Sequence, residues 1–164
     1  MQNLIKLREA TTEDIPLIQT IAEQTWRPTY GHILTEEQTL FMLDMMYSSE
    51  SLTRQFETNT FVFAYEGDTP LGFAGFERKD DEVMKLHKLY MLPTAQGKGI
   101  GKLLIQEVAK YAKQLGLKFV HLNVNRNNKA IGFYEKQGFK IIKEEDINIG
   151  NDYWMNDYVM QLEV

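Results

Sequence analysis

The chain has 164 residues, of which 43% are hydrophobic and 25% are charged, and it contains no cysteine. This length and balance are typical of one globular domain, so we expect residues 1–164 to form a single domain. The lack of cysteine excludes disulfide bonds, thiolate metal ligands and a cysteine nucleophile. The net charge of −5 argues against a nucleic-acid partner, because such binding depends on neutralising phosphates.

Localisation and metal content are inferred from features that the chain lacks. No stretch approaches the roughly 20 apolar residues that span a bilayer, and the first residues lack the apolar core of a signal peptide. We therefore expect a cytoplasmic protein with no membrane partner, in keeping with the missing cysteine. The three histidines, His32, His87 and His121, lack the spacing of metal-binding motifs, so we predict no metal site.

The first half of the chain predicts one strand followed by helices. Apolar and charged residues alternate over residues 5–8, as in a half-buried strand. A hydroxyl cap and acidic residues at 11–14 predict a helix start, and the sequence of residues 26–31 predicts its break. Further helices are expected after Thr35 and after Ser48.

The second half alternates strands and helices. The expected strands cover residues 61–65, 71–76, 83–92, 119–124, 139–143 and 153–163, and the expected helices cover residues 100–115 and 128–137. This order predicts an α+β fold, in which a mixed, mostly antiparallel sheet carries helices on both faces.

A glycine-rich turn between a strand and a helix is the strongest local signal. Glycines at 97, 99 and 101 remove side chains where a ligand would approach the backbone. The first amides of the following helix have no partners within the helix, so a phosphate fits there. The spacing matches neither a Walker A loop nor the Rossmann fingerprint, which argues against an alternative reading as an ATP-binding regulatory domain.

Two segments carry a resemblance to the GNAT superfamily of acyl-CoA-dependent N-acetyltransferases. Residues 96–101, Gln-Gly-Lys-Gly-Ile-Gly, resemble the Gln/Arg-x-x-Gly-x-Gly/Ala signature of that family. Residues 123–139 resemble its next motif, Asn-x-x-Ala-x-x-Phe-Tyr-x-x-x-Gly-Phe, in the expected order and separation. The resemblance is strong over residues 83–142 and implies an acetyltransferase fold with a splayed sheet.

The resemblance implies that acetyl-CoA is the co-substrate and assigns residues to it. The turn would hold the pyrophosphate through backbone amides, the strand before the turn would pair with the pantetheine arm, and two asparagines would contact that arm or its ordered water. The implied cofactor residues are Leu89, Met91, Gln96, Gly97, Lys98, Gly99, Ile100, Gly101, Lys102, Asn123 and Asn128.

The resemblance also implies roles in catalysis. Tyr134 would donate a proton to the departing thiolate, and the Met91 N–H would polarise the thioester carbonyl. Where many family members carry a glutamate base, this chain has His87. We expect His87 to share a strand face with Lys85 and Leu89, opposite Leu86. A structural histidine is the alternative reading, and His121 is a weaker candidate base.

The acceptor of the acetyl group is expected to be a small-molecule amine. The resemblance places the wall of its pocket at Trp26, Tyr30 and Tyr153, with Glu145, Asp146 and Asp152 available to attract a cation; a core role for the aromatics is the alternative.

The chain is also similar to bacterial spermidine/spermine N-acetyltransferases, which suggests a polyamine. A peptide or protein amine and a non-catalytic acyl-CoA sensor remain alternatives. A homodimer is compatible with the sequence, because the last strand would leave a sheet edge of the kind that is commonly buried.

Overall fold

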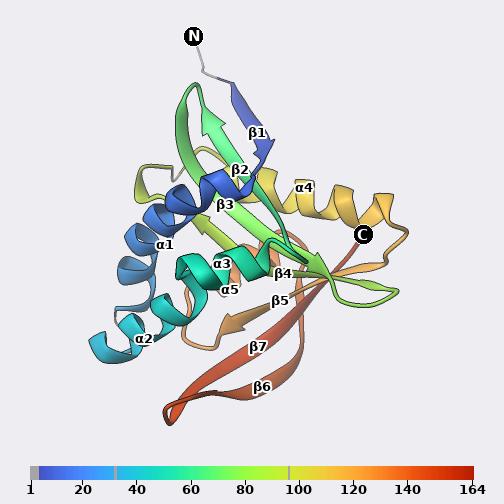
Figure 1. The fold of residues 1–164 in the computed structure, drawn as a ribbon. Helices are drawn as coiled ribbons and strands as arrows, with labels where there is room; N and C mark the ends of the chain where they lie inside the picture. Colours follow the sequence, from blue (N-terminus) through green and yellow to red (C-terminus); the bar gives the residue numbers. More distant parts are fainter. Residues whose placement is uncertain (1–3, 32, 96) are drawn as a thin grey trace.

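The computed structural model describes residues 4–31, 33–95 and 97–164. Its centre is one seven-stranded sheet in the order β1-β2-β3-β4-β5-β7-β6 (Figure 1). The strands are β1 (Ile5–Glu9), β2 (Thr60–Glu66), β3 (Thr69–Arg78), β4 (Val83–Met91), β5 (Phe119–Asn125), β6 (Lys140–Gly150) and β7 (Tyr153–Glu163). All neighbouring pairs are antiparallel except β4 and β5, so the predicted mixed sheet is confirmed.

Helices cover both faces of the sheet, as the sequence predicts (Figure 1). They are α1 (Ile15–Tyr30), α2 (Glu36–Tyr47), α3 (Ser49–Gln55), α4 (Ile100–Gln114) and α5 (Ala130–Lys136), with short 3-10 turns η1 (Thr12–Asp14) and η2 (Pro93–Ala95). Leu104 and Val108 of α4 belong to the core on one face, and Ile18 of α1 and Leu52 of α3 belong to the core on the other. None of the helices in the described ranges is long and apolar enough to cross a membrane.

The first helix ends within the predicted break at residues 26–31, but later than a break beginning at Trp26 implies: α1 continues to Tyr30 with Pro28 inside it, and Gly31 is its C-cap. Proline removes one backbone hydrogen bond from a helix. Packing outweighs that loss here, since Trp26 is only 1% exposed in the core and contacts the Tyr30 ring at a centroid distance of 4.5 Å. Local propensity is a weak guide where tertiary contacts of this size form.

The C-terminal hairpin also differs from expectation. Strand β6 extends to Gly150 rather than to residue 143, and β7 lies between β5 and β6. The last strand is therefore not an edge of the sheet, and the edges are β1 and β6. Association of two copies through an edge stays a prediction, and the strand concerned is β6, where Ile141 and Ile142 are each 44% exposed.

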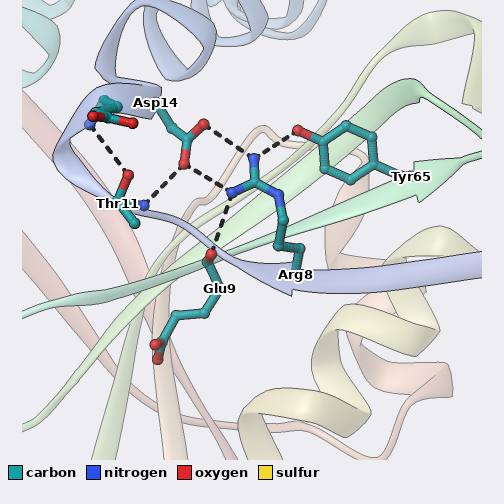
Figure 2. A network of polar contacts seen from close by, with 6 residues as sticks. Arg8, Glu9, Thr11, Asp14 and Tyr65 are labelled. Carbon is teal, nitrogen blue, oxygen red and sulfur yellow. Dashed lines mark hydrogen bonds and ion pairs between the residues drawn. The ribbon is translucent and has the colours of Figure 1, made fainter.

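A polar network fixes the start of the chain against the sheet (Figure 2). The Arg8 guanidinium donates to both carboxylate oxygens of Asp14, at 3.1 and 3.0 Å, and to the Tyr65 hydroxyl at 2.8 Å. Asp14 also accepts the backbone N–H of Thr11 at 2.9 Å. The hydrogen bond from Arg8 holds the pKa of the Asp14 carboxyl below its ordinary value. The Arg8 side chain therefore ties β1 to η1 through Asp14 and to β2 through Tyr65.

We predict that Asp14→Asn lowers the free energy of unfolding by about 1 kcal/mol at pH 7, because the bidentate, partly exposed ion pair with Arg8 is lost. Since the folded pKa of Asp14 is depressed, its contribution is present above the unfolded value of about 3.9 and is lost as pH falls through the folded value. Urea unfolding from pH 7 to pH 3 measures this difference. Glu13→Gln, one residue away, is the control and should change little; a difference that persists undiminished at pH 3 contradicts the assignment.

Candidate active site

A cleft opens where β4 and β5 part. The two strands pair only from Val83 with Phe119 to Leu86 with Leu122, although β4 runs on to Met91 and β5 to Asn125. A cavity of about 410 Å³ lies along the parting. The splayed sheet that the sequence predicts is therefore confirmed, and it places one edge of β4 beside open space.

Four parts of the fold line this cleft. They are the end of α1 with the segment after it (Thr25, Pro28, Tyr30 and Ile33), residues 86–91 of β4, residues 122–124 of β5, and the segment around the start of α5 (residues 127–130, Phe133 and Tyr134). The cleft thus brings together the expected residues His87, Leu89, Met91, Asn123, Asn128, Tyr134 and Tyr30.

The unpaired edge of β4 presents backbone donors to the cleft. The Leu92 N–H donates to the Leu71 carbonyl of β3 at 2.8 Å. Because successive N–H groups of a strand point to opposite sides, those of Met91 and Leu89 point away from β3 and toward the parting. An extended ligand lying in the cleft can therefore pair with β4 as an added strand would.

His87 occupies a β-bulge. In the pairing with β3, Lys88 lies opposite Gly75 and Leu86 lies opposite Phe76, which leaves His87 as the extra residue. The bulge reverses the alternation of side chains, so Leu86 and Leu89 pack in the same core. The expectation that Leu86 and Leu89 lie on opposite faces is therefore wrong.

His87 is paired with a carboxylate that the sequence analysis did not single out. Its Nε2 lies 2.8 Å from Oε1 of Glu77 on β3. Burial lowers the pKa of the His87 imidazole, and the hydrogen bond to Glu77 offsets part of that effect. The imidazole is therefore neutral at pH 7, and Glu77 accepts the Nε2 proton while Nδ1 keeps a free lone pair.

Tyr134 lies on the opposite wall, on α5. Its ring packs between Phe133, at a centroid distance of 5.5 Å, and Phe139, at 5.8 Å. Burial raises the pKa of the Tyr134 phenol, so the hydroxyl keeps its proton at pH 7. It is therefore a neutral hydrogen-bond donor in the cleft that the free edge of β4 also lines.

The glycine turn lies outside the cleft at the start of α4. Gly97 and Gly99 have φ values of 81° and 70°, a backbone conformation that favours glycine. Gly99 is the N-cap residue of α4 and provides no capping side chain, while Lys98 contacts Glu66 at 2.8 Å. Gln96 lies outside the described residues. The turn is exposed at residues 97–99, which leaves the helix N-terminus open to an anion.

Gly101 lets α4 approach the cleft wall. A Cβ at this position would lie 2.8 Å from Phe133 Cζ and 2.9 Å from Met91 Sδ. The two residues that flank Gly101, Ile100 and Lys102, lie in the first turn of α4, and Ile100 is buried. The start of α4 is thus in contact with both the end of β4 and α5.

The two asparagines of the cleft are held by other groups. Asn123 accepts a hydrogen bond from Lys85 Nζ and donates to Glu145 at 3.1 Å and to Asp157 at 3.2 Å. The side-chain oxygen of Asn128 accepts the Ala130 N–H at 2.8 Å, which starts α5. Both line the cleft, but these oxygens already have protein partners.

The expected acceptor residues do not all reach the cleft. Tyr30 lines it, and burial raises the pKa of its phenol to about 12. Trp26 is buried in the core, so it offers no surface to a ligand. Tyr153 packs on Phe41 at a centroid distance of 5.2 Å and lies outside the cleft lining. His121 pairs with Gln161, and His32 lies outside the described residues.

Comparison with known proteins gives the family. The sequence profile described as "Acetyltransferase (GNAT) family" matches residues 18–139. The chain belongs to the GNAT acetyltransferase family. This membership favours coenzyme A over ATP as the ligand of the glycine turn.

The chain is similar to two named GNAT relatives and to one solved GNAT structure. It is 31% identical over 158 residues to a spermidine N(1)-acetyltransferase from Thermoplasma acidophilum, covering 92% of this chain and 95% of the relative. It is 31% identical over 108 residues to the peptidyl-lysine N-acetyltransferase YjaB of Escherichia coli, covering 63% and 67%. The crystal structure of PaiA N-acetyltransferase from T. acidophilum in complex with coenzyme A matches with a TM-score of 0.84 at 28% identity, covering 98% of this chain and 99% of that one.

Two residues of this GNAT site were missed from sequence. Glu77 lies ten positions before His87 and comes beside it only because β3 and β4 pair. Lys88 lines the cleft but is only 9% exposed. A lysine beside a histidine in a strand matches no sequence motif. The position of Glu77 beside His87 follows only from the register between β3 and β4.

We predict that Gly99→Ala weakens coenzyme A binding at least tenfold, because the αL backbone at the start of α4 is strained by a Cβ and the helix terminus shifts. Gly116→Ala is the matched control, since Gly116 has a φ of 73° at the other end of α4 and equally open surroundings. Both variants should lose about 1 kcal/mol of stability, measured by urea unfolding. Calorimetry with coenzyme A separates them; equal affinities would refute a role for the turn.

Proposed function

We propose that this GNAT enzyme transfers the acetyl group of acetyl-CoA to a primary amine of a small molecule, by direct attack in a ternary complex. The observation that carries the proposal is that the free backbone edge of β4 and Tyr134 line the same cleft. Attack of an amine on a thioester needs a neutral amine, a polarised carbonyl and a stabilised leaving thiolate. Each need has a candidate group in this cleft.

The co-substrate is proposed to follow the free edge of β4. Backbone amides of residues 97–102 would hold the pyrophosphate at the start of α4, where the helix dipole favours negative charge. The pantetheine arm would pair with Leu89 and Met91, and Asn123 and Asn128 would border it. Support comes from the similar T. acidophilum structure, which is a complex with coenzyme A.

The acid and the oxyanion donor are proposed from the two walls of the cleft. The Met91 N–H would stabilise the charge that develops on the carbonyl oxygen. Tyr134 would donate its proton to the thiolate as the C–S bond breaks, and the raised pKa of its phenol keeps that proton in place until then. A non-catalytic sensor would not need such an acid, so the presence of Tyr134 favours an enzyme.

The base is proposed to be His87. Its lowered pKa supplies a neutral imidazole at pH 7, and Glu77 fixes the tautomer with Nδ1 free to accept the amine proton. The proton passes from the attacking nitrogen to His87 as the C–N bond forms, either directly or through water. Glu77 then stabilises the imidazolium.

The acceptor is the least constrained part of the proposal. A polyamine is supported by the name of the T. acidophilum relative, and a peptide or protein amine by that of the E. coli relative. Two of the three acidic residues suggested for attracting a cation already have cationic partners, since Glu145 pairs with Lys143 at 3.0 Å and Asp146 with Arg126 at 2.8 Å. Asp152, the third, lies outside the cleft lining. We therefore propose the amine class and leave its members to an assay.

The test is an acetyl-CoA assay over polyamines, aminoglycosides, amino acids and peptide N-termini, with Tyr134→Phe beside the wild type. We predict that Tyr134→Phe lowers kcat about 100-fold for the amine that is used, because the thiolate leaves without a proton donor. The affinity for coenzyme A, measured by calorimetry, should stay near the wild-type value.

Tyr111→Phe is the control for the removal of a hydroxyl, because Tyr111 lies on α4 and its hydroxyl contacts Glu9 at 3.3 Å. If Tyr134→Phe turned over at the wild-type rate, Tyr134 would not be the general acid. Absence of coenzyme A binding by the wild-type protein would remove the proposed function altogether.

The pH dependence of kcat tests the base. We predict that His87→Gln lowers kcat about 100-fold and that Glu77→Gln moves the acid limb of the wild-type profile to lower pH. The sign follows because Glu77 raises the pKa of His87, so its removal lets the imidazole lose its proton at lower pH.

Glu82→Gln is the matched control, since Glu82 contacts Lys118 at 3.3 Å at the other end of β4. Its profile should overlay that of the wild type. An unchanged acid limb in both His87→Gln and Glu77→Gln would show that another group titrates.

A further inference from the structure

The ionisable residues of the cleft are unevenly charged. Among the described lining residues there are two lysines and no carboxylate, and the remaining ionisable side chains are His87 and three tyrosines. Lys129 stands at the start of α5, whereas Lys88 lies on β4 directly after the bulge. A polycationic acceptor would therefore meet positive charge on the walls of this cleft.

The side chain of Lys88 is held in place by contacts with α2 and α3. It is 9% exposed, its Nζ donates to Gln55 Oε1 at 2.7 Å, and it lies 5.3 Å from the centre of the Tyr47 ring. Gln55 is itself fixed, because its Nε2 donates to the Met46 carbonyl at 2.7 Å and to the Ser51 hydroxyl at 3.0 Å. Helix α3 thus aims a carbonyl oxygen at the ammonium group.

Lys88 has no direct ion pair among the described residues. The carboxylate that acts on it, Glu77, does so without a salt bridge and lies 2.8 Å from His87. Burial lowers the pKa of Lys88 to about 8, so the ammonium form still dominates at pH 7. An ammonium group has three donors, and Gln55 takes one of them.

Two acidic side chains further along the sheet, on β6 and β7, accept hydrogen bonds from Asn123. Glu145 accepts from Asn123 and pairs with Lys143. Asp157 is 2% exposed and accepts from Asn123. Neither lines the cleft, so neither offsets the charge of Lys88 for a ligand there.

We propose that Lys88 binds a carboxylate of the acceptor, so that the acceptor is an amine that also carries an anionic group, of the amino-acid type, rather than a polyamine. This inference rests on the proposed acetyl transfer. A carboxylate would form the direct ion pair that Lys88 lacks among the described residues, an arrangement that stabilises a buried charge. The adjacent His87 would then stand near the amine of the same molecule.

The test uses pairs of amines that differ only by a carboxylate, namely lysine with cadaverine and ornithine with putrescine, within a wider panel. In every pair from which the wild type acetylates at least one amine, we expect kcat/KM to be at least tenfold higher for the amine that carries the carboxylate. A hydrogen bond between charged groups contributes enough binding free energy for a tenfold difference. Lys88→Met should remove the preference by raising KM for the amino acid, while KM for acetyl-CoA stays constant. Lys88→Arg should restore part of it.

Lys118→Met is the control for the removal of a lysine. Lys118 pairs with Glu82 at 3.3 Å and lies outside the cleft lining, so its removal should leave the ratio unchanged. If Lys88→Met does not fold, the wild-type ratios decide by themselves. Turnover confined to amines without a carboxylate, or an equal ratio in the wild type and Lys88→Met, overturns the inference but leaves the acetyl transfer intact. Absence of turnover with every amine overturns the acetyl transfer as well.

Discussion

The parting of β4 from β5 after Leu86 and Leu122 is the constraint on which the candidate site depends. Backbone N–H groups that leave a sheet must find another acceptor, because an unpaired buried donor costs free energy. In this fold the donors of Leu89 and Met91 are left at the cleft, where water or an extended ligand can meet them. Pairing of β4 and β5 along their full length would close the cavity and leave Tyr134 facing a completed sheet.

Side chains on both sides of the parting keep its geometry. On one side Lys85 bonds to Asn123 across the last paired residues, and Arg126 bonds to the Asp157 and Glu145 carbonyls, at 3.3 Å each. On the other side Gly101 allows α4 to contact Met91 and Phe133. The helix that would take the pyrophosphate is thereby positioned relative to the strand that would take the thioester.

Sequence reasoning succeeded where the signal was local and failed where it depended on pairing. The apolar period of α4 and the alternation of strands and helices predicted the element order, and the two motifs predicted the family. The bulge at His87 could not be predicted, because it exists only in the register between β3 and β4. Residues 26–31 predicted a break at a place where packing of Trp26 keeps α1 helical to Tyr30. Strand β6 extends through the mostly exposed residues 144–150, where the alternation of Ile147 and Ile149 with polar residues is too short to predict a strand.

The charge of the whole chain and the charge of the cleft have opposite signs, and the local charge decides binding. The net charge of −5 is spread over a surface where screening acts within about 8 Å at physiological ionic strength. Lys88 is buried at the wall of the cleft, where the effective dielectric is lower and its interaction with a charged ligand would be correspondingly stronger. Distant acidic groups can raise the encounter rate of a cation, but they cannot remove the repulsion from an ammonium held in place by Gln55. The side chain that selects the acceptor is therefore the buried one in contact with it, whatever the sign of the total.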